Sequence, residues 1–138
     1  MATVFTGGCL CGAIRYECTG QPVLSANCHC RDCQKASGGT YTSALFVPKG
    51  TLKITGDVKY YDKTGDSGQV ISRGFCPHCG SALFGKPTIL PGLISIRPGT
   101  LDDPSTFQPA MDIYTSSAQP WDYMNPGLPK YPKLPPSS

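Results

Sequence analysis

The stretch Cys28-His29-Cys30-Arg31-Asp32-Cys33 places three thiols within six residues. Cysteines separated by one residue do not easily reach disulfide geometry, whereas a metal ion about 2.3 Å from each sulfur can be enclosed by such a tight turn. The C-x-C-x2-C spacing therefore predicts a zinc site. A structural zinc ion takes four protein ligands, and this stretch supplies three. Either a distant residue completes the site, or the fourth position is open to water or substrate.

Two further thiol pairs are each followed by a glycine. Cys9 and Cys11 precede Gly12, and Cys76 and Cys79 precede Gly80. A glycine there can adopt a positive φ and turn backbone N–H groups toward metal-bound sulfurs. Together the pairs offer four thiolates, enough for a closed structural site joining segments roughly 65 residues apart. The spacing indicates two zinc ions without fixing which cysteines share one, and the three-thiol stretch, followed by Gln34, is expected to differ.

The composition points to a helix-poor chain. It has 138 residues, 39% of them hydrophobic, and no apolar run near the 18 residues that a transmembrane helix needs. We therefore expect a single domain over residues 1–138 with no membrane span. The 16 glycines and 14 prolines favour short strands and turns. The first residues lack a basic segment followed by an apolar one, so we expect no secretory signal and a cytoplasmic protein with reduced thiols.

Two other classes of protein fit the sequence less well. Eight cysteines could form a secreted disulfide framework, but the C-x-C spacings and the lack of a signal argue against it. The formal net charge of +3 suggests a nucleic-acid partner only while the cysteines are counted as neutral. Seven thiolates and two zinc ions would bring the net charge to zero, so nucleic acid is an unlikely partner.

Hydrophobic alternation between turn signals predicts a series of short strands. A proline-rich extended tail is expected from about residue 109, lying across the domain and pinned by Trp121. A single helical turn at 34–36 should end at Gly38 and Gly39. The expected strands are 13–18, 23–27, 41–47, 52–55, 58–61, 69–75, 81–84 and 93–96.

Several side chains near the thiols have two interpretations. Arg31 and Lys35 flank the three-thiol stretch and are candidate substrate contacts, although cations beside thiolates can simply offset negative charge. His29 and His78 each lie between cysteines, and we expect both imidazoles to face solvent rather than bind metal. The Cys76-Pro77-His78-Cys79 segment is also typical of dithiol oxidoreductases, but those motifs need a helix N-terminus where strands are predicted here. Cys18 is expected in the core.

Three motifs together resemble one family. Gly-Gly-Cys-Leu-Cys-Gly-Ala-Ile-Arg-Tyr at 7–16, Cys-His-Cys-Arg-Asp-Cys at 28–33 and Phe-Cys-Pro-His-Cys-Gly-Ser at 75–81 look like the glutathione-dependent formaldehyde-activating enzymes. Segments 99–104 and 113–121 resemble the C-terminal part of that family. The resemblance implies a mainly β fold, a β-tent of small antiparallel sheets with little helix. It also implies two zinc ions, a structural one on Cys9, Cys11, Cys76 and Cys79, and a catalytic one on Cys28, Cys30 and Cys33.

The resemblance also implies an activity. The expected function is a zinc-dependent carbon–sulfur lyase that adds a thiol such as glutathione to formaldehyde or another small aldehyde, with these small molecules as its partners. One alternative is a zinc hydrolase of carbon–nitrogen double bonds acting on an imine, with water taking the place of the thiol. Another is a non-catalytic, zinc-stabilised binding module, which would gain nothing from an unfinished three-cysteine site.

Overall fold

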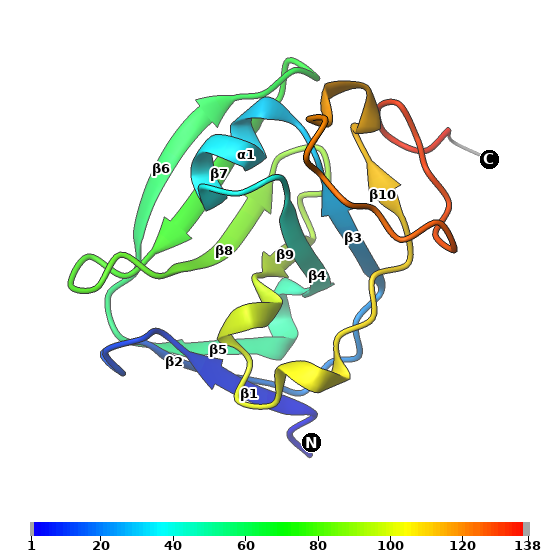
Figure 1. Cartoon of the computed structure of the whole chain (residues 1–138). Helices are drawn as coiled ribbons and strands as arrows, with labels where there is room; N and C mark the ends of the chain where they lie inside the picture. Colours follow the sequence, from blue (N-terminus) through cyan, green and yellow to red (C-terminus); the bar gives the residue numbers. More distant parts are fainter. Residues whose placement is uncertain (1, 137–138) are drawn as a thin grey trace.

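The computed structural model describes residues 2–136 and is built from two β-sheets and one short α-helix (Figure 1). One sheet has three strands in the order β1-β2-β5, and the other has seven in the order β10-β3-β4-β9-β8-β7-β6. The mainly β, helix-poor fold is thus confirmed. The strands are β1 (Phe5–Gly8), β2 (Arg15–Cys18), β3 (Leu24–Cys28), β4 (Thr42–Pro48), β5 (Leu52–Thr55), β6 (Lys59–Thr64), β7 (Val70–Phe75), β8 (Ala82–Pro87), β9 (Leu93–Ile96) and β10 (Asp112–Ile113).

The three-stranded sheet is antiparallel and half-buried. In β2, Tyr16 and Cys18 are buried while Arg15 and Glu17 are exposed, as the alternation of the sequence predicts. Strand β1 was not expected, because it contains Gly7 and Gly8. Its partner is β2, with Gly7 opposite Tyr16. A Cβ at Gly7 would lie 2.2 Å from the Tyr16 hydroxyl oxygen, so close packing requires glycine there.

The seven-stranded sheet is larger than the small sheets that the resemblance implied. Strands β6 to β9 form a meander of antiparallel neighbours, and β4 and β3 continue the sheet beyond β9. The expected strands at 41–47, 69–75 and 81–84 appear with shifts of one to three residues at their ends. At the far edge, β10 pairs with β3 in parallel, so this sheet is not wholly antiparallel.

The helix α1 (Arg31–Ser37) begins three residues before the predicted helical turn. Cys30 is its N-cap, and its sulfur accepts a hydrogen bond from the Cys33 backbone N–H at 3.3 Å. Gly38 ends the helix in the left-handed region, with φ of 76°. The helix packs against β4 and lies over the seven-stranded sheet in Figure 1.

The hydrophobic core lies where β2 faces strands of the larger sheet. Tyr16 of β2 and Phe84 of β8 meet edge-to-face with ring centroids 5.4 Å apart. Cys18 is fully buried in this cluster, so its predicted place in the core is confirmed. The core joins Tyr16 and Cys18 of β2 with aliphatic side chains from β4, β8 and β9, and it includes three sulfurs, those of Cys9, Cys18 and Cys76.

The segment after residue 107 runs beside β3 and then doubles back. Backbone N–H groups of Ala110, Asn27 and His29 donate to the carbonyls of Ser25, Met111 and Ile113, respectively. The returning segment bonds to β10, because the Asp112 N–H donates to the Pro129 carbonyl and the Tyr131 N–H donates to the Asp112 carbonyl. The prediction that Trp121 pins the segment is wrong, since this side chain is 70% exposed. Within residues 2–136, no helix is long and apolar enough to cross a membrane.

Candidate metal centres and the adjoining cavity

Cys9, Cys11, Cys76 and Cys79 form the first cluster, called here the four-thiol cluster. Their sulfurs all lie within 4.8 Å of one another. The Cys9 and Cys11 sulfurs are 3.7 Å apart, and the Cys11 and Cys76 sulfurs are 3.8 Å apart. A tetrahedral zinc ion with sulfurs at about 2.3 Å requires sulfurs about 3.8 Å from each other. The donor set and its spacing therefore fit a four-coordinate ion.

Two similar turns build this cluster. Gly12 and Gly80 both have positive φ, 81° and 77°, as predicted from their places after the thiol pairs. Each donates its backbone N–H to the carbonyl of the first cysteine of its turn, Gly12 to Cys9 and Gly80 to Cys76. The Ile14 N–H donates to the Cys9 sulfur at 3.2 Å. Such N–H groups stabilise the negative charge of bound thiolates.

Ser81 links the two turns. Its hydroxyl accepts a hydrogen bond from the Leu10 N–H at 3.0 Å and lies 3.2 Å from the Cys79 sulfur. Hydrogen bonding from the Ser81 side chain is the main reason that the pKa of Cys79 is lowered, to about 5. Ser81 was not singled out in the sequence, although it directly follows the glycine of the second pair.

Cys28, Cys30 and Cys33 form the second cluster, called here the three-thiol cluster. Their sulfurs also lie within 4.8 Å of one another. Cys28 ends β3, Cys30 caps α1 and Cys33 lies in its first turn, so a strand-to-helix junction gathers the three thiols. Hydrogen bonds from Cys28 and then Cys30 lower the pKa of the Cys33 thiol, with a smaller contribution from the charge of Arg73. Three soft donors suit a zinc ion with one coordination position free.

His29 is fully buried, so the prediction that it faces solvent is wrong. Its Nε2 lies 2.8 Å from Asp112 Oδ1, and its Nδ1 is hydrogen-bonded to Asp122 Oδ2. Lys130 also reaches Asp112, at 3.3 Å. Because both ring nitrogens are engaged by carboxylates, His29 is not among the metal-binding groups. It instead fastens the three-thiol loop to the C-terminal segment.

Gln34 makes a second link between the same parts of the chain. Its side-chain Nε2 donates to the carbonyls of His29 and Ser117, at 2.8 and 2.9 Å. Its Oε1 accepts from Gln119 at 3.2 Å. The residue is buried, which is unusual for glutamine and is explained by these bonds.

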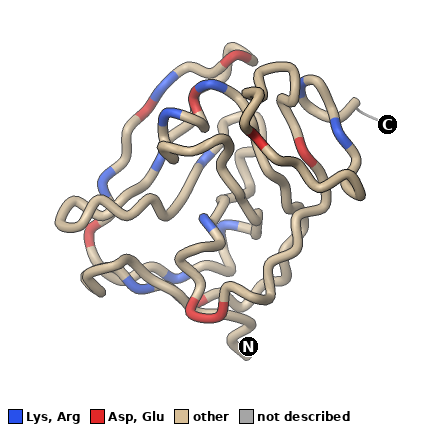
Figure 2. The backbone as a smooth tube through the Cα atoms, viewed as in Figure 1, with Lys and Arg blue, Asp and Glu red and all other residues tan. Residues whose placement is uncertain are grey.

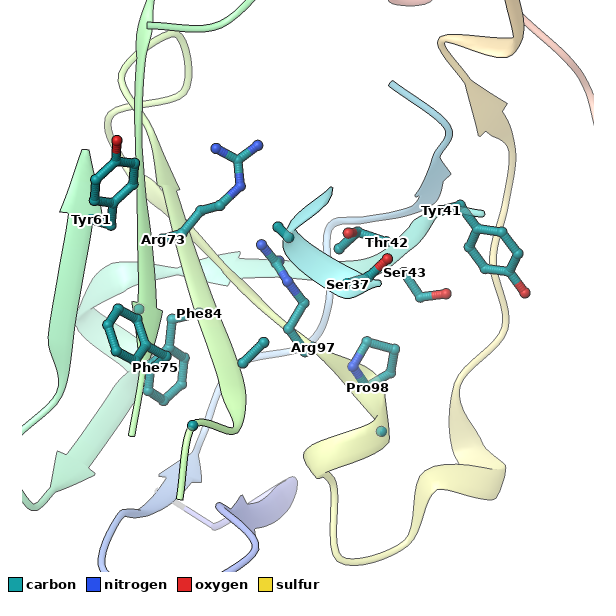
Figure 3. A pocket seen from close by; sticks show the side chains of 15 residues that line it. Ser37, Tyr41, Thr42, Ser43, Tyr61, Arg73, Phe75, Phe84, Arg97 and Pro98 are labelled. Carbon is teal, nitrogen blue, oxygen red and sulfur yellow. The ribbon is translucent and has the colours of Figure 1, made fainter. Parts of the chain in front are cut away.

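A cavity of about 610 Å³ opens beside the three-thiol loop, within the range of small-molecule sites (Figure 3). The end of α1 and the start of β4 form one wall, and strands β7 and β8 form another. Thr42 connects wall and thiols, because its hydroxyl donates to the Cys33 carbonyl at 3.0 Å. The lining combines hydroxyl groups, aromatic rings and two arginines: Ser37, Thr42, Ser43, Tyr41, Tyr61, Phe75, Phe84, Arg73 and Arg97.

Arg73 and Arg97 supply the charge of this space, called here the arginine cavity. Figure 3 shows both guanidinium groups in the space between the two walls. Both side chains are half-buried. Burial lowers the pKa of Arg97, while the nearby thiols of Cys33 and Cys28 act in the opposite direction. Among the residues that the structure describes, no acidic side chain lines the cavity.

The other predicted site residues lie outside the arginine cavity. Arg31 is exposed, bonds to the Gln34 side chain and borders two smaller hollows. Lys35 is also exposed and borders one of these hollows with Trp121. Their role as substrate contacts stays a prediction. His78 is exposed, as expected. Basic and acidic residues alternate along the backbone in Figure 2 and do not separate into one positive and one negative region.

The fold and the site together define a class of protein: mainly β, with two cysteine clusters able to hold metal ions. Residues 4–117 match the family described as glutathione-dependent formaldehyde-activating enzyme. The chain therefore belongs to that family, whose members are enzymes. The match spans both thiol clusters, both arginines and β10, and it confirms the resemblance seen in the three motifs.

A solved structure has a similar fold. It is described as the crystal structure of a Rhodobacter sphaeroides protein, Northeast Structural Genomics target RhR83. The TM-score is 0.59 over 91% of this chain and 98% of that one, with 16% sequence identity. At that identity the likeness supports the fold.

Arg73 and Arg97 were missed in the sequence. Along β7, every second residue is Ile71, Arg73 and Phe75, so a charged residue stands between two apolar ones on one face of the strand. A charge on such a face is a signal for a lined cavity or a buried partner. Arg97 follows β9 directly, and we find no comparable sequence signal for it.

Proposed function

We propose that this protein is a zinc-dependent carbon–sulfur lyase that joins a small thiol and a small aldehyde. The observation that carries the proposal is the three-thiol cluster beside a cavity large enough for both reactants. A fourth cysteine would close the site. The description of the family, glutathione-dependent formaldehyde-activating enzyme, supports a reaction between a thiol and an aldehyde.

In this proposal the two clusters have different roles. Cys9, Cys11, Cys76 and Cys79 hold a structural zinc ion, and Cys28, Cys30 and Cys33 hold a catalytic one. A zinc ion with an open position supplies a Lewis acid that lowers the pKa of a bound thiol or polarises a carbonyl. The reaction is an addition: a sulfur–carbon bond forms, the carbonyl π electrons move to oxygen, and this oxygen takes the proton that the thiol releases. Nothing is oxidised or reduced.

The protein's own side chains supply the environment for this step. The three cysteines fix where the reactive sulfur can sit, because Cys30 and Cys33 are held in the helix cap and first turn. Arg73 and Arg97 offset the negative charge that the thiolates bring together. The rings of Tyr61, Phe75 and Phe84 line the cavity with apolar surface.

Metal analysis tests the two roles. We expect up to two zinc ions per chain, with the three-thiol cluster losing its ion first under mild chelation, because an open position admits the chelator. A single zinc ion that reconstitution cannot raise, with Cys28, Cys30 and Cys33 all open to alkylation, would remove the catalytic site from the proposal.

Cobalt substitution tests the thiol reaction. Adding glutathione to the cobalt form should intensify sulfur-to-metal charge-transfer absorption and release a proton, and the Cys30→Ser protein should lose that response. A spectrum that small thiols leave unchanged, but that imines or amines perturb, would replace the lyase by the hydrolase of carbon–nitrogen double bonds.

A further inference from the structure

The arginine cavity holds more hydrogen-bond donors than the protein uses. Within the described residues, Arg73 makes no side-chain hydrogen bond, and its Nε is buried without a partner. Arg97 makes one, from Nη1 to the Ser95 hydroxyl at 2.9 Å. Each guanidinium has five N–H donors in a fixed, planar arrangement. Buried donors without acceptors cost free energy unless a ligand meets them.

Offsetting the thiolates is the simplest alternative explanation for these arginines. It accounts for their charge but leaves their N–H groups unused, because no hydrogen bond joins either guanidinium to a cysteine sulfur in the described chain. Three thiolates with one zinc ion carry a net charge of minus one, so two arginines leave one positive charge in excess before substrate binds. The two guanidinium groups also oppose each other, since Arg73 contributes to lowering the pKa of Arg97.

We infer that Arg73 and Arg97 bind the carboxylate of a small substrate whose reacting group reaches the three-thiol cluster. The inference rests on the function proposed above and names the substrate class of the same cavity. A carboxylate carries one negative charge and has two oxygens that match the guanidinium fork. The Phe75 and Tyr61 rings and Pro98 offer apolar surface to the organic part of such a molecule. The carboxylate can belong to the thiol or to the aldehyde.

Paired ligands that differ only in charge test this inference on the zinc-loaded protein. Calorimetric titration compares 3-mercaptopropionate with 3-mercaptopropionamide, its neutral counterpart, and glyoxylate with glyoxylamide. The neutral amide lacks the charged hydrogen bond that the carboxylate makes, and the loss of such a bond lowers affinity by about tenfold or more. We expect that preference for the carboxylate in at least one pair. Equal affinities within both pairs would overturn the inference without any variant being made.

Variants then assign the preference to the two arginines. Arg73→Gln and Arg97→Gln should each reduce the ratio of carboxylate to amide affinity to about threefold or less. Arg73→Lys should retain part of the preference, because a lysine keeps the charge but loses the planar fork. Arg15→Gln is the matched control. It removes the same charge, yet Arg15 lies outside the arginine cavity and is paired with Asp102. A loss of preference in Arg15→Gln as large as in Arg73→Gln would show general electrostatics and overturn the specific contact.

The inference and the proposed function can fail separately. Propionate has no thiol, and its binding is followed by amide chemical shifts of residues around Arg73 and Arg97. If propionate binds there while cobalt spectra show no thiol at the three-thiol cluster, the carboxylate site stands and the thiol reaction fails. If thiols reach the metal but charged and neutral ligands bind equally, the thiol reaction stands and the carboxylate site fails.

Discussion

The four-thiol and three-thiol clusters are built in opposite ways. The first consists of two similar turns, each closed by its own glycine, and the nearest stabilising groups are the N–H groups of those turns and Ser81. The second consists of one loop whose neighbours come from far along the chain, among them Asp112 and Asp122. Each turn of the four-thiol cluster is thus encoded locally, whereas the three-thiol loop depends on distant contacts to hold its shape.

The largest expected difference comes from removing one sulfur from each cluster. Cys79→Ser should destabilise the whole chain, because a structural zinc site contributes about 10 kcal/mol or more and binding free energy is folding free energy. Cys30→Ser should spare the fold and abolish activity. Thermal unfolding and metal analysis of both variants measure this, and equal losses of stability would show that the clusters do not divide structural and catalytic roles.

The two histidines provide a smaller, matched test. His29→Ala removes the side-chain partner of buried Asp122 and one of the partners of buried Asp112, and it should cost about 3–5 kcal/mol in the free energy of unfolding. His78→Ala, at the equivalent place between cysteines but exposed, should change it by less than about 0.5 kcal/mol. Chemical denaturation measures both. Faster alkylation of Cys28 in His29→Ala would show that the three-thiol loop has loosened. Similar small losses of stability for both histidine variants would contradict the role of the buried contacts between His29 and the two aspartates.

Gln34→Leu tests the second link to the three-thiol loop. Leucine fills a similar volume but removes the bonds that the Gln34 amide donates to the carbonyls of His29 and Ser117, so we expect a loss of about 1–3 kcal/mol. The free energy of unfolding gives the size of the effect. Amide hydrogen exchange should rise around Ser117 and leave the turn at Gly80 unchanged, and a uniform rise in both places would argue against a local link.

The smallest effect concerns the surface beside the four-thiol cluster. Arg15 donates to Asp102 at 2.9 Å, and this guanidinium, followed by the Thr6 hydroxyl, lowers the pKa of Asp102 to about 2. Since the folded pKa lies below the unfolded value, the stabilisation is present above about pH 4 and is lost as the pH falls toward 2. Asp102→Asn should be slightly less stable than the wild type at pH 7, and the gap should narrow as the pH falls from about 4 toward 2.

Denaturant unfolding at each pH, with the same zinc concentration for both proteins, measures that gap. Added salt should reduce it as well, because the pair is exposed. Asp57→Asn is the control, at an exposed carboxylate for which the described residues offer no ion pair. A gap that does not change with pH would mean that Asp102 acts through Thr6 packing or backbone effects instead.

Sequence patterns were sufficient where a structure depends on neighbours along the chain. The turns at Gly12 and Gly80 follow from a C-x-C or C-x2-C pair plus a residue that tolerates positive φ. The strand at Leu52–Thr55 and the strand at Leu93–Ile96 were predicted with their observed bounds, because turn signals flank both.

Prediction failed where partners are distant. Strand β10 has two residues and no periodicity of its own, and its hydrogen bonds come from β3. His29 looked like a solvent-facing residue because its partners, Asp112 and Asp122, lie more than eighty residues away. The guanidinium groups of Arg73 and Arg97 share one cavity only because β7 and β9 flank β8 in the sheet. No local pattern contains that information.

The contact between His29 and Asp122 also sets an order of assembly during synthesis. A growing chain leaves the ribosome from its N-terminus, so all four sulfurs of the four-thiol cluster are available once Cys79 has emerged. The loop around His29 must wait for Asp122, about forty residues later. The cysteines of the three-thiol loop emerge earlier still, but this loop acquires its final shape only as the C-terminal segment docks, after the four-thiol cluster has all its residues.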